Sequence, residues 1–346
     1  MEELFKEIFL FLSLIQEGGL ESNLLILALL ILFQIVFSFY NEELVLMELI
    51  SRVRNAIKDN KYLSGYELIF VNDYSTDRSE EILISEIQNS EDLVLVNMSR
   101  NFGTGECVYA GFSVSKGDAI VYMDSDLQDP PEVIEDLITE FVKDQEVEVV
   151  YTTRKSRAGE SRLKLLLTSI AYKFIKYISN IDIPTGSGDF KLLSRRVVDL
   201  MLKHEEKLPY IRGLVSFYGF KQKQVFYDRE ARFDGAENTK YPFLSKRMID
   251  NNLDKVFISF SDAPLKITLY TGFFIALLSF FYLIFILFQY FLGNNLPGWS
   301  AVMASILILG GVQVSLIGFI GLYINQIFLA VKGRPNYVID RIIRKE

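Results

Sequence analysis

The densest group of polar side chains able to do chemistry follows the apolar run at residues 120–123. It brings three carboxylates and one amide within six residues: Asp124, Asp126, Gln128 and Asp129. If the run is a β-strand, a spacing of two lets Asp124 and Asp126 point to the same side. Two such carboxylates can hold Mg2+ or Mn2+ while a substrate pyrophosphate supplies further ligands. The alternative is a strand-to-helix turn whose acids only cap the next helix.

The rest of the composition narrows the chemistry. The 346 residues contain one Cys and one His, which excludes a disulfide scaffold and a Cys-based zinc site. The single His204 lies in a polar run and is interpreted as a solvated helix residue. Catalysis would therefore rest on carboxylates, basic side chains or a metal, rather than on a Ser-His-Asp or Cys-His arrangement. A net charge of -8 argues against nucleic acid as a partner.

The elements that would position these acids alternate between apolar strands and amphipathic helices. We predict strands at residues 31–39, 66–72, 93–97, 119–123 and 148–152. We predict helices between them, from Tyr40 to about Asp59 and at 77–88, 103–115 and 131–143. This alternation predicts an α/β fold with a mostly parallel sheet and helices on both faces. Ligands of such sheets bind at the carboxyl ends of the strands, where the sequence has four polar sets, at 40–43, 72–77, 101–103 and 124–129.

The two ends of the chain differ from its middle. Residues 267–292 and 301–331 carry no charge, and each run is longer than the ~20 apolar residues that a bilayer span requires. Basic residues flank the pair and none lies in the linker, so the positive-inside rule puts both ends in the cytoplasm. The predicted order is an apolar extension of uncertain role at 1–30, a cytoplasmic catalytic domain at 31–240, amphipathic juxtamembrane helices at 241–265, two transmembrane helices within 266–331 (about 267–292 and 301–327) with a short external loop, and a basic cytoplasmic tail at 332–346.

Six ordered motifs spread over residues 34–342 resemble those of family-2 glycosyltransferases of the polyprenyl-phosphate type. This family includes dolichol-phosphate mannose synthase and the bacterial undecaprenyl-phosphate glucosyltransferases. The motifs are Tyr40-Asn-Glu-Glu43, Val71-Asn-Asp-Tyr-Ser-Thr-Asp77, Asn101-Phe-Gly103, Met123-Asp-Ser-Asp-Leu-Gln-Asp-Pro-Pro-Glu132, Gly188-Asp-Phe-Lys-Leu192 and Val331-Lys-Gly-Arg-Pro335. The resemblance implies a GT-A fold and an inverting transfer of a sugar from a nucleotide-sugar, UDP-glucose first, to undecaprenyl phosphate. It also implies a multi-pass protein of the bacterial cytoplasmic membrane, and it leaves a homo-oligomer open.

The resemblance further implies roles for single residues on the donor side. Asp73 would contact the nucleotide base or ribose, while Asp124 and Asp126 would address the ribose and a diphosphate bound to Mg2+ or Mn2+. Both acids would ligate the metal, and Asp126 is the catalytic one of the two. Gln128 would line the same site. The other implied donor contacts are Tyr40, Glu42, Arg232 and Lys240. The last two belong to a segment that closes over the donor in relatives, and its Gly-to-Lys spacing is longer here.

On the acceptor side, Asp189 matches the family's candidate catalytic base. The acceptor phosphate is itself an anion near neutral pH, because the second pKa of phosphate monoesters is ~6. Asp189 would then mainly orient the acceptor or take up a residual proton. Arg154, Arg157 and Lys164 match positions where the family is basic around the acceptor phosphate, and a guanidinium offers a planar fork to phosphate oxygens. Alternatively, these three residues bind anionic membrane lipids at ~1 kcal/mol each without a catalytic role.

Two other functions stay open at this level. A processive polysaccharide synthase shares the sheet and the acidic motifs but normally carries Gln-x-x-Arg-Trp, and the only Trp here is Trp299, in the predicted external loop. A non-catalytic membrane partner of a glycan pathway would tolerate the loss of Asp126 or Asp189, and both are present. The partners expected for the enzyme are a nucleotide-sugar, a polyprenyl phosphate and the membrane.

Overall fold

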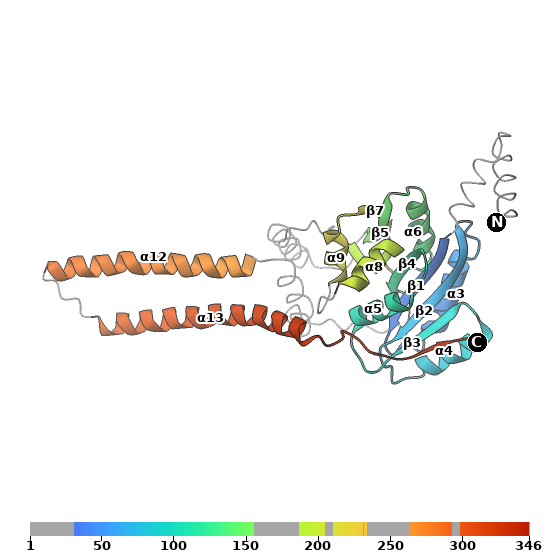
Figure 1. Ribbon diagram of the computed structural model, residues 1–346, viewed down its shortest axis with the longest axis horizontal. Helices are drawn as coiled ribbons and strands as arrows, with labels where there is room; N and C mark the ends of the chain where they lie inside the picture. Colours follow the sequence, from blue (N-terminus) through green and yellow to red (C-terminus); the bar gives the residue numbers. More distant parts are fainter. Residues whose placement is uncertain are drawn as a thin grey trace, which may run out of the picture.

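The computed structural model has one large β-sheet, from which two long helices project (Figure 1). It describes residues 31–155, 187–204, 210–230, 232–233, 263–292 and 298–345. Within these residues the sheet has eight strands in the order β7-β5-β6-β4-β1-β2-β3-β8. The strands are β1 (Ile31–Phe39), β2 (Leu63–Asn72), β3 (Leu93–Met98), β4 (Ala119–Asp124), β5 (Val147–Arg154), β6 (Ser187–Ser194), β7 (Lys221–Tyr227) and β8 (Ile339–Arg344).

The middle of the sheet, β4-β1-β2-β3, is parallel, as the alternation of strands and helices predicts. The helices of this domain are α3 (Leu46–Ile57), α4 (Ser79–Asn89), α5 (Thr104–Val114), α6 (Val133–Val142), α8 (Arg195–Lys203) and α9 (Ile211–Phe217). Apolar side chains of α3, α4 and α6 fill the core on one face of the sheet, and those of α5, α8 and α9 fill the core on the other. The prediction of helices on both faces is therefore confirmed.

Helix α3 begins at Leu46 rather than at Tyr40, which corrects the sequence prediction. The backbone amides before it donate to side chains of the loop after β2 and of the first residue of α4: Asn41 to Ser75 Oγ at 3.0 Å, Glu43 to Asp77 Oδ2 at 3.1 Å and Glu42 to Ser79 Oγ at 3.0 Å. These bonds replace the helical ones that the sequence suggests. Two of the predicted polar sets, the loops after β1 and β2, are thereby held against each other.

A buried glutamine explains the polar interruption of the β1 run. Gln34 is 3% exposed, and its Oε1 accepts hydrogen bonds from the backbone amides of Lys116 and Gly117, both at 2.6 Å. A side chain at residue 117 would put a Cβ 2.7 Å from the carbonyl oxygen of Leu32, so glycine is needed there. These contacts lock the start of β1 to the turn before β4, and both strands then reach the same edge of the sheet in register.

Three strands that complete the sheet were not predicted from the sequence: β6, β7 and β8. β7 pairs with β5 in parallel, whereas β6 and β8 are antiparallel to their neighbours. β6 lies between β4 and β5, and β8 runs along the outer edge of β3. The β8 residues fall inside the predicted basic tail at 332–346. A short segment of mixed polarity can become a strand here because the edge of β3 offers unpaired amides and carbonyls. The chain therefore returns to the sheet after its last helix.

Two long helices lie side by side beyond the sheet: α12 (Ala263–Phe291) and α13 (Trp299–Lys332) (Figure 1). Among the described residues, one helical segment, Leu309–Lys332, is long and apolar enough to cross a membrane by length and composition, and α12 contains a shorter apolar stretch, Tyr270–Tyr282. The predicted span at 267–292 is thus not confirmed and stays a prediction. The predicted extension at 1–30 and most of the juxtamembrane region at 241–265 lie outside the described residues.

Candidate active site

A polar cleft opens at the carboxyl ends of β1, β2 and β4. Its volume is ≈ 220 Å³, and its walls come from the loops after these strands and the start of α5. Five residues expected on the donor side line it: Tyr40, Glu42, Asp73, Asp124 and Asp126. The parallel register explains why they meet, because Ser38 of β1 lies level with Asp124 of β4, and Phe39 of β1 with Asn72 of β2. Strand ends that are far apart in the sequence thus become neighbours.

Asp124 ends β4 among other carboxylates. Burial is the main reason that its pKa is raised to about 7. Three neighbouring carboxylates add to this effect: Asp189, Asp126 and Asp129. A divalent cation favours the charged form of such crowded acids, so the donor set fits one. The described residues contain no group of three or more His, Cys, Asp and Glu side chains that could hold a metal ion. A cation in the cleft would therefore bind Asp124 and Asp126 and complete its coordination with oxygens of the substrate.

A tight turn, rather than the pleat of a strand, directs Asp126 into the cleft. The strand ends at Asp124, so the alternation of a strand, from which the sequence predicted a common direction for the two acids, does not extend to Asp126. Leu127 has a φ of 55°, and Asp126 Oδ1 accepts a hydrogen bond from the Gln128 amide at 3.1 Å. The Ser125 hydroxyl donates to the carbonyl of β1 residue 38 at 3.0 Å and fastens the turn to that strand. Both acids line the cleft, although the reason differs from the one predicted.

Asp73 is 5% exposed and uses both carboxylate oxygens to hold the loop after β3. Its Oδ1 accepts from the Phe102 amide at 2.7 Å and its Oδ2 from the Gly103 amide at 2.9 Å. Gly103 adopts a φ of 111°, which other residues rarely take, so the loop depends on glycine at this position. Asp73 therefore shapes one wall of the cleft. Its contact with a nucleotide stays a prediction.

The chain after β7 returns to the rim of the cleft. Arg232 forms an ion pair with Glu42 at 2.7 Å, which joins two residues expected to bind the donor. The Glu230 amide donates to the Gln128 carbonyl at 2.9 Å and so fastens this segment to the acidic turn. Gln128 is 4% exposed and is not among the residues that line the cleft. Lys240 lies outside the described residues.

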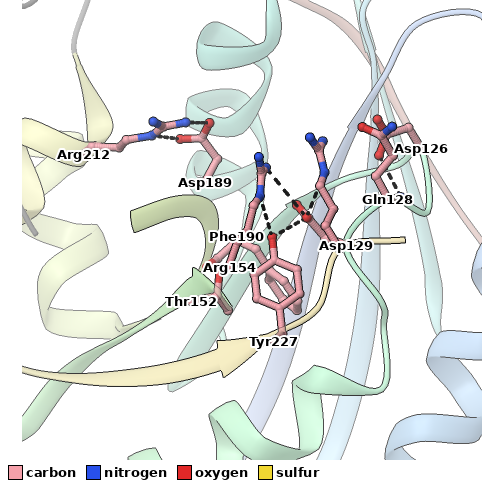
Figure 2. A network of polar contacts seen from close by, with 10 residues as sticks. Asp126, Gln128, Asp129, Thr152, Arg154, Asp189, Phe190, Arg212 and Tyr227 are labelled. Atoms are coloured by element: carbon pink, nitrogen blue, oxygen red, sulfur yellow. Dashed lines mark hydrogen bonds and ion pairs between the residues drawn. The ribbon is translucent and has the colours of Figure 1, made fainter. Parts of the chain in front are cut away.

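Asp189 lies on β6, next to β4, and is held by an arginine from α9 (Figure 2). Both of its oxygens accept hydrogen bonds from Arg212, with 2.6 Å between Oδ1 and Nε. Burial alone would raise the pKa of Asp189, but Arg212 more than reverses this and leaves the pKa below its ordinary value. The family resemblance implies a candidate catalytic base at this position. A carboxylate held charged by a bidentate guanidinium is a weak base that is well fixed in orientation.

A second network in the same region engages Arg154 (Figure 2). Its Nε donates to the Tyr227 hydroxyl at 3.2 Å, and that hydroxyl donates to Asp129 Oδ1 at 2.5 Å. Arg154 Nη2 also lies 3.9 Å from Asp129. Burial, aided by Asp129, raises the pKa of Tyr227 to about 12. Arg154, expected to bind the acceptor phosphate, is thus already engaged by the protein, and Arg157 and Lys164 lie outside the described residues.

Comparison with known proteins reveals the family. Residues 34–201 match the family described as glycosyl transferase family 2. The chain is also 38% identical over 310 residues to the uncharacterized glycosyltransferase YkcC of Bacillus subtilis, and the match covers 89% of this chain and 93% of the relative. The chain belongs to glycosyltransferase family 2. The family resemblance seen in the motifs is therefore confirmed, together with a GT-A-like α/β fold.

Another relative of this glycosyltransferase is the SfII prophage-derived bactoprenol glucosyl transferase of Shigella flexneri. It is 34% identical over 311 residues, which cover 89% of this chain and 97% of the relative. Among solved structures, glucosyl-3-phosphoglycerate synthase from Mycobacterium tuberculosis, in complex with Mn2+, UDP and phosphoglyceric acid, matches with a TM-score of 0.40 and 18% identity. That match covers 58% of this chain and 71% of the other.

The glycosyltransferase contains site residues that sequence reasoning did not single out. Arg212 and Tyr227 belong to no quoted motif, and folding alone brings them to Asp189 and Asp129. Lys191 lies in a quoted motif without an assigned role; it is 3% exposed, and burial lowers its pKa to about 7. One signal was present for Arg212, because it is the single charged residue in the apolar sequence of α9.

Proposed function

We propose that this enzyme transfers a sugar, with inversion, from a nucleotide-sugar to undecaprenyl phosphate at the cytoplasmic face of a bacterial membrane. One observation carries the proposal: a cleft lined by Asp124 and Asp126 lies beside a region where basic side chains surround Asp189. The relative named bactoprenol glucosyl transferase, 34% identical over 89% of this chain, supports a polyprenyl phosphate as the acceptor. Its name also makes UDP-glucose the first donor to test.

The leaving nucleoside diphosphate would develop negative charge in the cleft. Mg2+ or Mn2+ bound there supplies Lewis-acid stabilisation of that charge and orients the diphosphate. Asp124 and Asp126 would hold the cation, and the burial that raises the pKa of Asp124 to about 7 makes a nearby positive charge favourable. Arg232, which lies at the rim on Glu42, would add a further positive charge beside the donor.

The acceptor needs orientation more than activation. A phosphate monoester has a second pKa of ~6, so its attacking oxygen is already charged near neutral pH. Asp189 is a poor base because its pKa lies below the ordinary value. We therefore propose that Asp189 mainly orients the acceptor and the basic side chains around it. Uptake of a residual proton from the acceptor would be a minor role.

The helices beyond the sheet suit a lipid acceptor. Leu309–Lys332 can cross a bilayer by length and composition, and the chain re-enters the sheet at Ile339 soon afterwards. This short return would keep the cleft close to the lipid headgroups. We further propose α12 as a second span, with both ends of the helix pair in the cytoplasm, on the basis of the basic residues that flank them.

The direct test uses the purified full-length protein and undecaprenyl phosphate in detergent. UDP-glucose, UDP-N-acetyl sugars, other UDP-sugars and GDP-mannose are each supplied with Mg2+ or Mn2+, and lipid-linked product is detected by its mass. We expect one donor to give product and EDTA to abolish it. If no donor gives product and Asp126→Asn leaves the glycans of cells unchanged, the proposal is wrong and a non-catalytic role replaces it.

A further inference from the structure

Strand β8 follows α13 in the chain and lies along β3 (Figure 1). In their antiparallel register Arg341 lies level with Asn97, and Arg344 lies level with Val94. Because β3 runs parallel to β1 and β2, its carboxyl end points the same way as the strand ends that form the cleft. Arg341 is therefore near the cleft end of the sheet, whereas Arg344 lies toward the opposite end.

Arg341 begins a chain of hydrogen bonds that leads into the sheet. Its Nη2 donates to Oε1 of Glu80, which lies in the first turn of α4. The same oxygen accepts from Asn97 Nδ2 at 2.9 Å. Asn97 Oδ1 in turn accepts from Asn72 Nδ2 at 2.9 Å, and these two residues are only 5% and 2% exposed. One carboxylate thus joins an exposed guanidinium to a buried pair of amides.

The chain ends in the loops that form the cleft. Asn72 Oδ1 accepts from the Ser75 amide at 2.8 Å, and Ser75 Oγ accepts from the Asn41 amide at 3.0 Å. Asn72 ends β2, and the next residue, Asp73, lines the cleft. Asn41 lies between two further residues of the cleft lining. Both loops are therefore connected to β8 through side-chain hydrogen bonds.

The chemistry of the members fixes the direction of the chain. An ionised carboxylate only accepts hydrogen bonds, so Glu80 turns the NH2 group of Asn97 toward itself. The oxygen of Asn97 then faces Asn72, which donates to it and keeps its own oxygen for the Ser75 amide. An asparagine at residue 72 can donate and accept at once, whereas an ionised aspartate could only accept. Loss of Glu80 would leave a buried amide without its acceptor, which is costly.

We propose that Arg341 and Glu80 are positioning residues for the reaction, because they hold the loops after β1 and β2 in the arrangement that binds the nucleotide of the donor. The inference rests on the proposed function, which places that nucleotide in the cleft. It ties the donor site to the docking of β8, the strand that returns from α13. Nucleotide binding and β8 docking should then favour each other, because such coupling is reciprocal.

The test uses the full-length protein in detergent and two measurements, amide hydrogen exchange by mass spectrometry and calorimetric titration with UDP. Arg341→Met removes the guanidinium and Glu80→Met removes the carboxylate. Glu80→Gln keeps an oxygen that can accept from Asn97. Arg344→Met is the matched control, because it removes an arginine of the same strand whose ion pair, at 3.6 Å, is with Glu67 of β2 rather than with α4.

We expect Glu80→Met to speed amide exchange in the loop at residues 73–77 and to weaken UDP binding about tenfold, because the buried amide pair loses its acceptor. Arg341→Met should weaken UDP binding about threefold, since its ion pair is partly exposed. Glu80→Gln and Arg344→Met should stay near the wild type. Exchange in β5 should be the same in all variants, which excludes general loosening. UDP should also slow exchange in β8 of the wild type, an effect that a purely structural contact does not produce.

UDP affinity that both Arg341→Met and Glu80→Met leave unchanged overturns the inference, and so does equal weakening by Arg344→Met. A wild-type protein that binds neither UDP nor GDP overturns the proposed function instead. In that case faster exchange at residues 73–77 in Arg341→Met would still support the connection between β8 and the cleft loops, so the two failures are distinguishable.

Discussion

The cleft lined by Asp73, Asp124 and Asp126, proposed to bind the donor (the donor cleft), and the surroundings of Asp189, proposed to bind the acceptor (the acceptor region), differ in how their polar side chains are hydrogen-bonded. In the cleft, Asp73 bonds to backbone amides of the loop after β3, and Asp126 bonds to a backbone amide of its own turn. In the acceptor region, Asp189 bonds to the side chain of Arg212, and the side chain of Lys191 has no hydrogen bond among the described residues. Because hydrogen bonds to the backbone hold the acids of the cleft, the fold itself fixes the shape of the cleft. Around Asp189 the contacts are between side chains, and the basic side chains there keep hydrogen-bond donors that a charged ligand can use.

The largest effect is expected in the cleft. Asp126→Asn keeps an oxygen for the Gln128 amide but removes the charge that would hold the cation. Sugar transfer should fall about 10²- to 10⁴-fold, because a Lewis acid is worth several kcal/mol in the transition state. The thermal midpoint should stay the same. Asp199→Asn, at a half-exposed acid on α8, is the control and should retain full activity. Equal transfer rates for Asp126→Asn and Asp199→Asn would mean that Asp126 does not hold a catalytic cation in the cleft.

The next effect is a pH dependence in the acceptor region. The pKa of Lys191 is about 7 in the folded protein against 10.5 ordinarily, so the unfolded chain binds more protons between these values. Wild-type stability should therefore rise with pH across that window. Lys191→Met lacks this titration and should be more stable than wild type at pH 7 and below, by a few kcal/mol, with the gap closing toward pH 10.5.

Thermal melts of both proteins across this window provide the measurement. The charged groups that face Lys191 are Asp189 on its own strand and Arg212 on α9, and both are kept in the variant. The variant that keeps the charge, Lys191→Arg, is the control, and it should not show the gain in stability. A stability gap that does not change with pH would mean that no buried ammonium titrates here.

A smaller effect is expected where a backbone contact of the cleft is cut. Asp73→Asn leaves one acceptor oxygen for the two amides of Phe102 and Gly103. One partly buried amide then lacks a partner, so the free energy of unfolding should fall by about 1–3 kcal/mol. Affinity for UDP should fall with it, because the loop after β3 loosens. Unfolding curves and UDP titrations check this, and unchanged stability would contradict the claim that backbone bonds shape the cleft.

The smallest effect is expected at Tyr227. Tyr227→Phe removes the hydroxyl between Arg154 and Asp129, but Arg154 and Arg229 still face that carboxylate at 3.9 and 3.6 Å. The loss of stability should be about 0.5–1.5 kcal/mol in unfolding measurements. Tyr218→Phe, whose hydroxyl lies on the exposed His204, is the matched control and should lose less. If Tyr227→Phe costs more stability than Asp73→Asn, the side-chain contacts around Asp129 contribute more to stability than the backbone contacts of the cleft, which reverses the expected order.

The donor cleft was largely predictable because Asp73 and Asp124 stand at the ends of apolar strands. The runs that end before Asp73 and Asp124 are visible in the sequence, and parallel neighbours bring their ends together without further information. The turn at Asp126 was harder to predict, because the left-handed φ of Leu127 has no signature in an apolar residue. The late start of α3 at Leu46 depends on contacts with a distant loop.

The sequence by itself determined the strand and helix alternation, the acidic cluster, the apolar C-terminal runs and the membership of the family. The tertiary structure alone decided which basic side chain contacts which carboxylate. β6 inserts between β4 and β5 against the parallel order, and α9 then delivers Arg212 to Asp189. Such pairings follow from the packing of distant segments rather than from residue spacing, since register and edge insertion are set by the assembled sheet. For that reason the acidic motifs could be recognised in the sequence, whereas the basic partners of Asp189 could not be predicted from it.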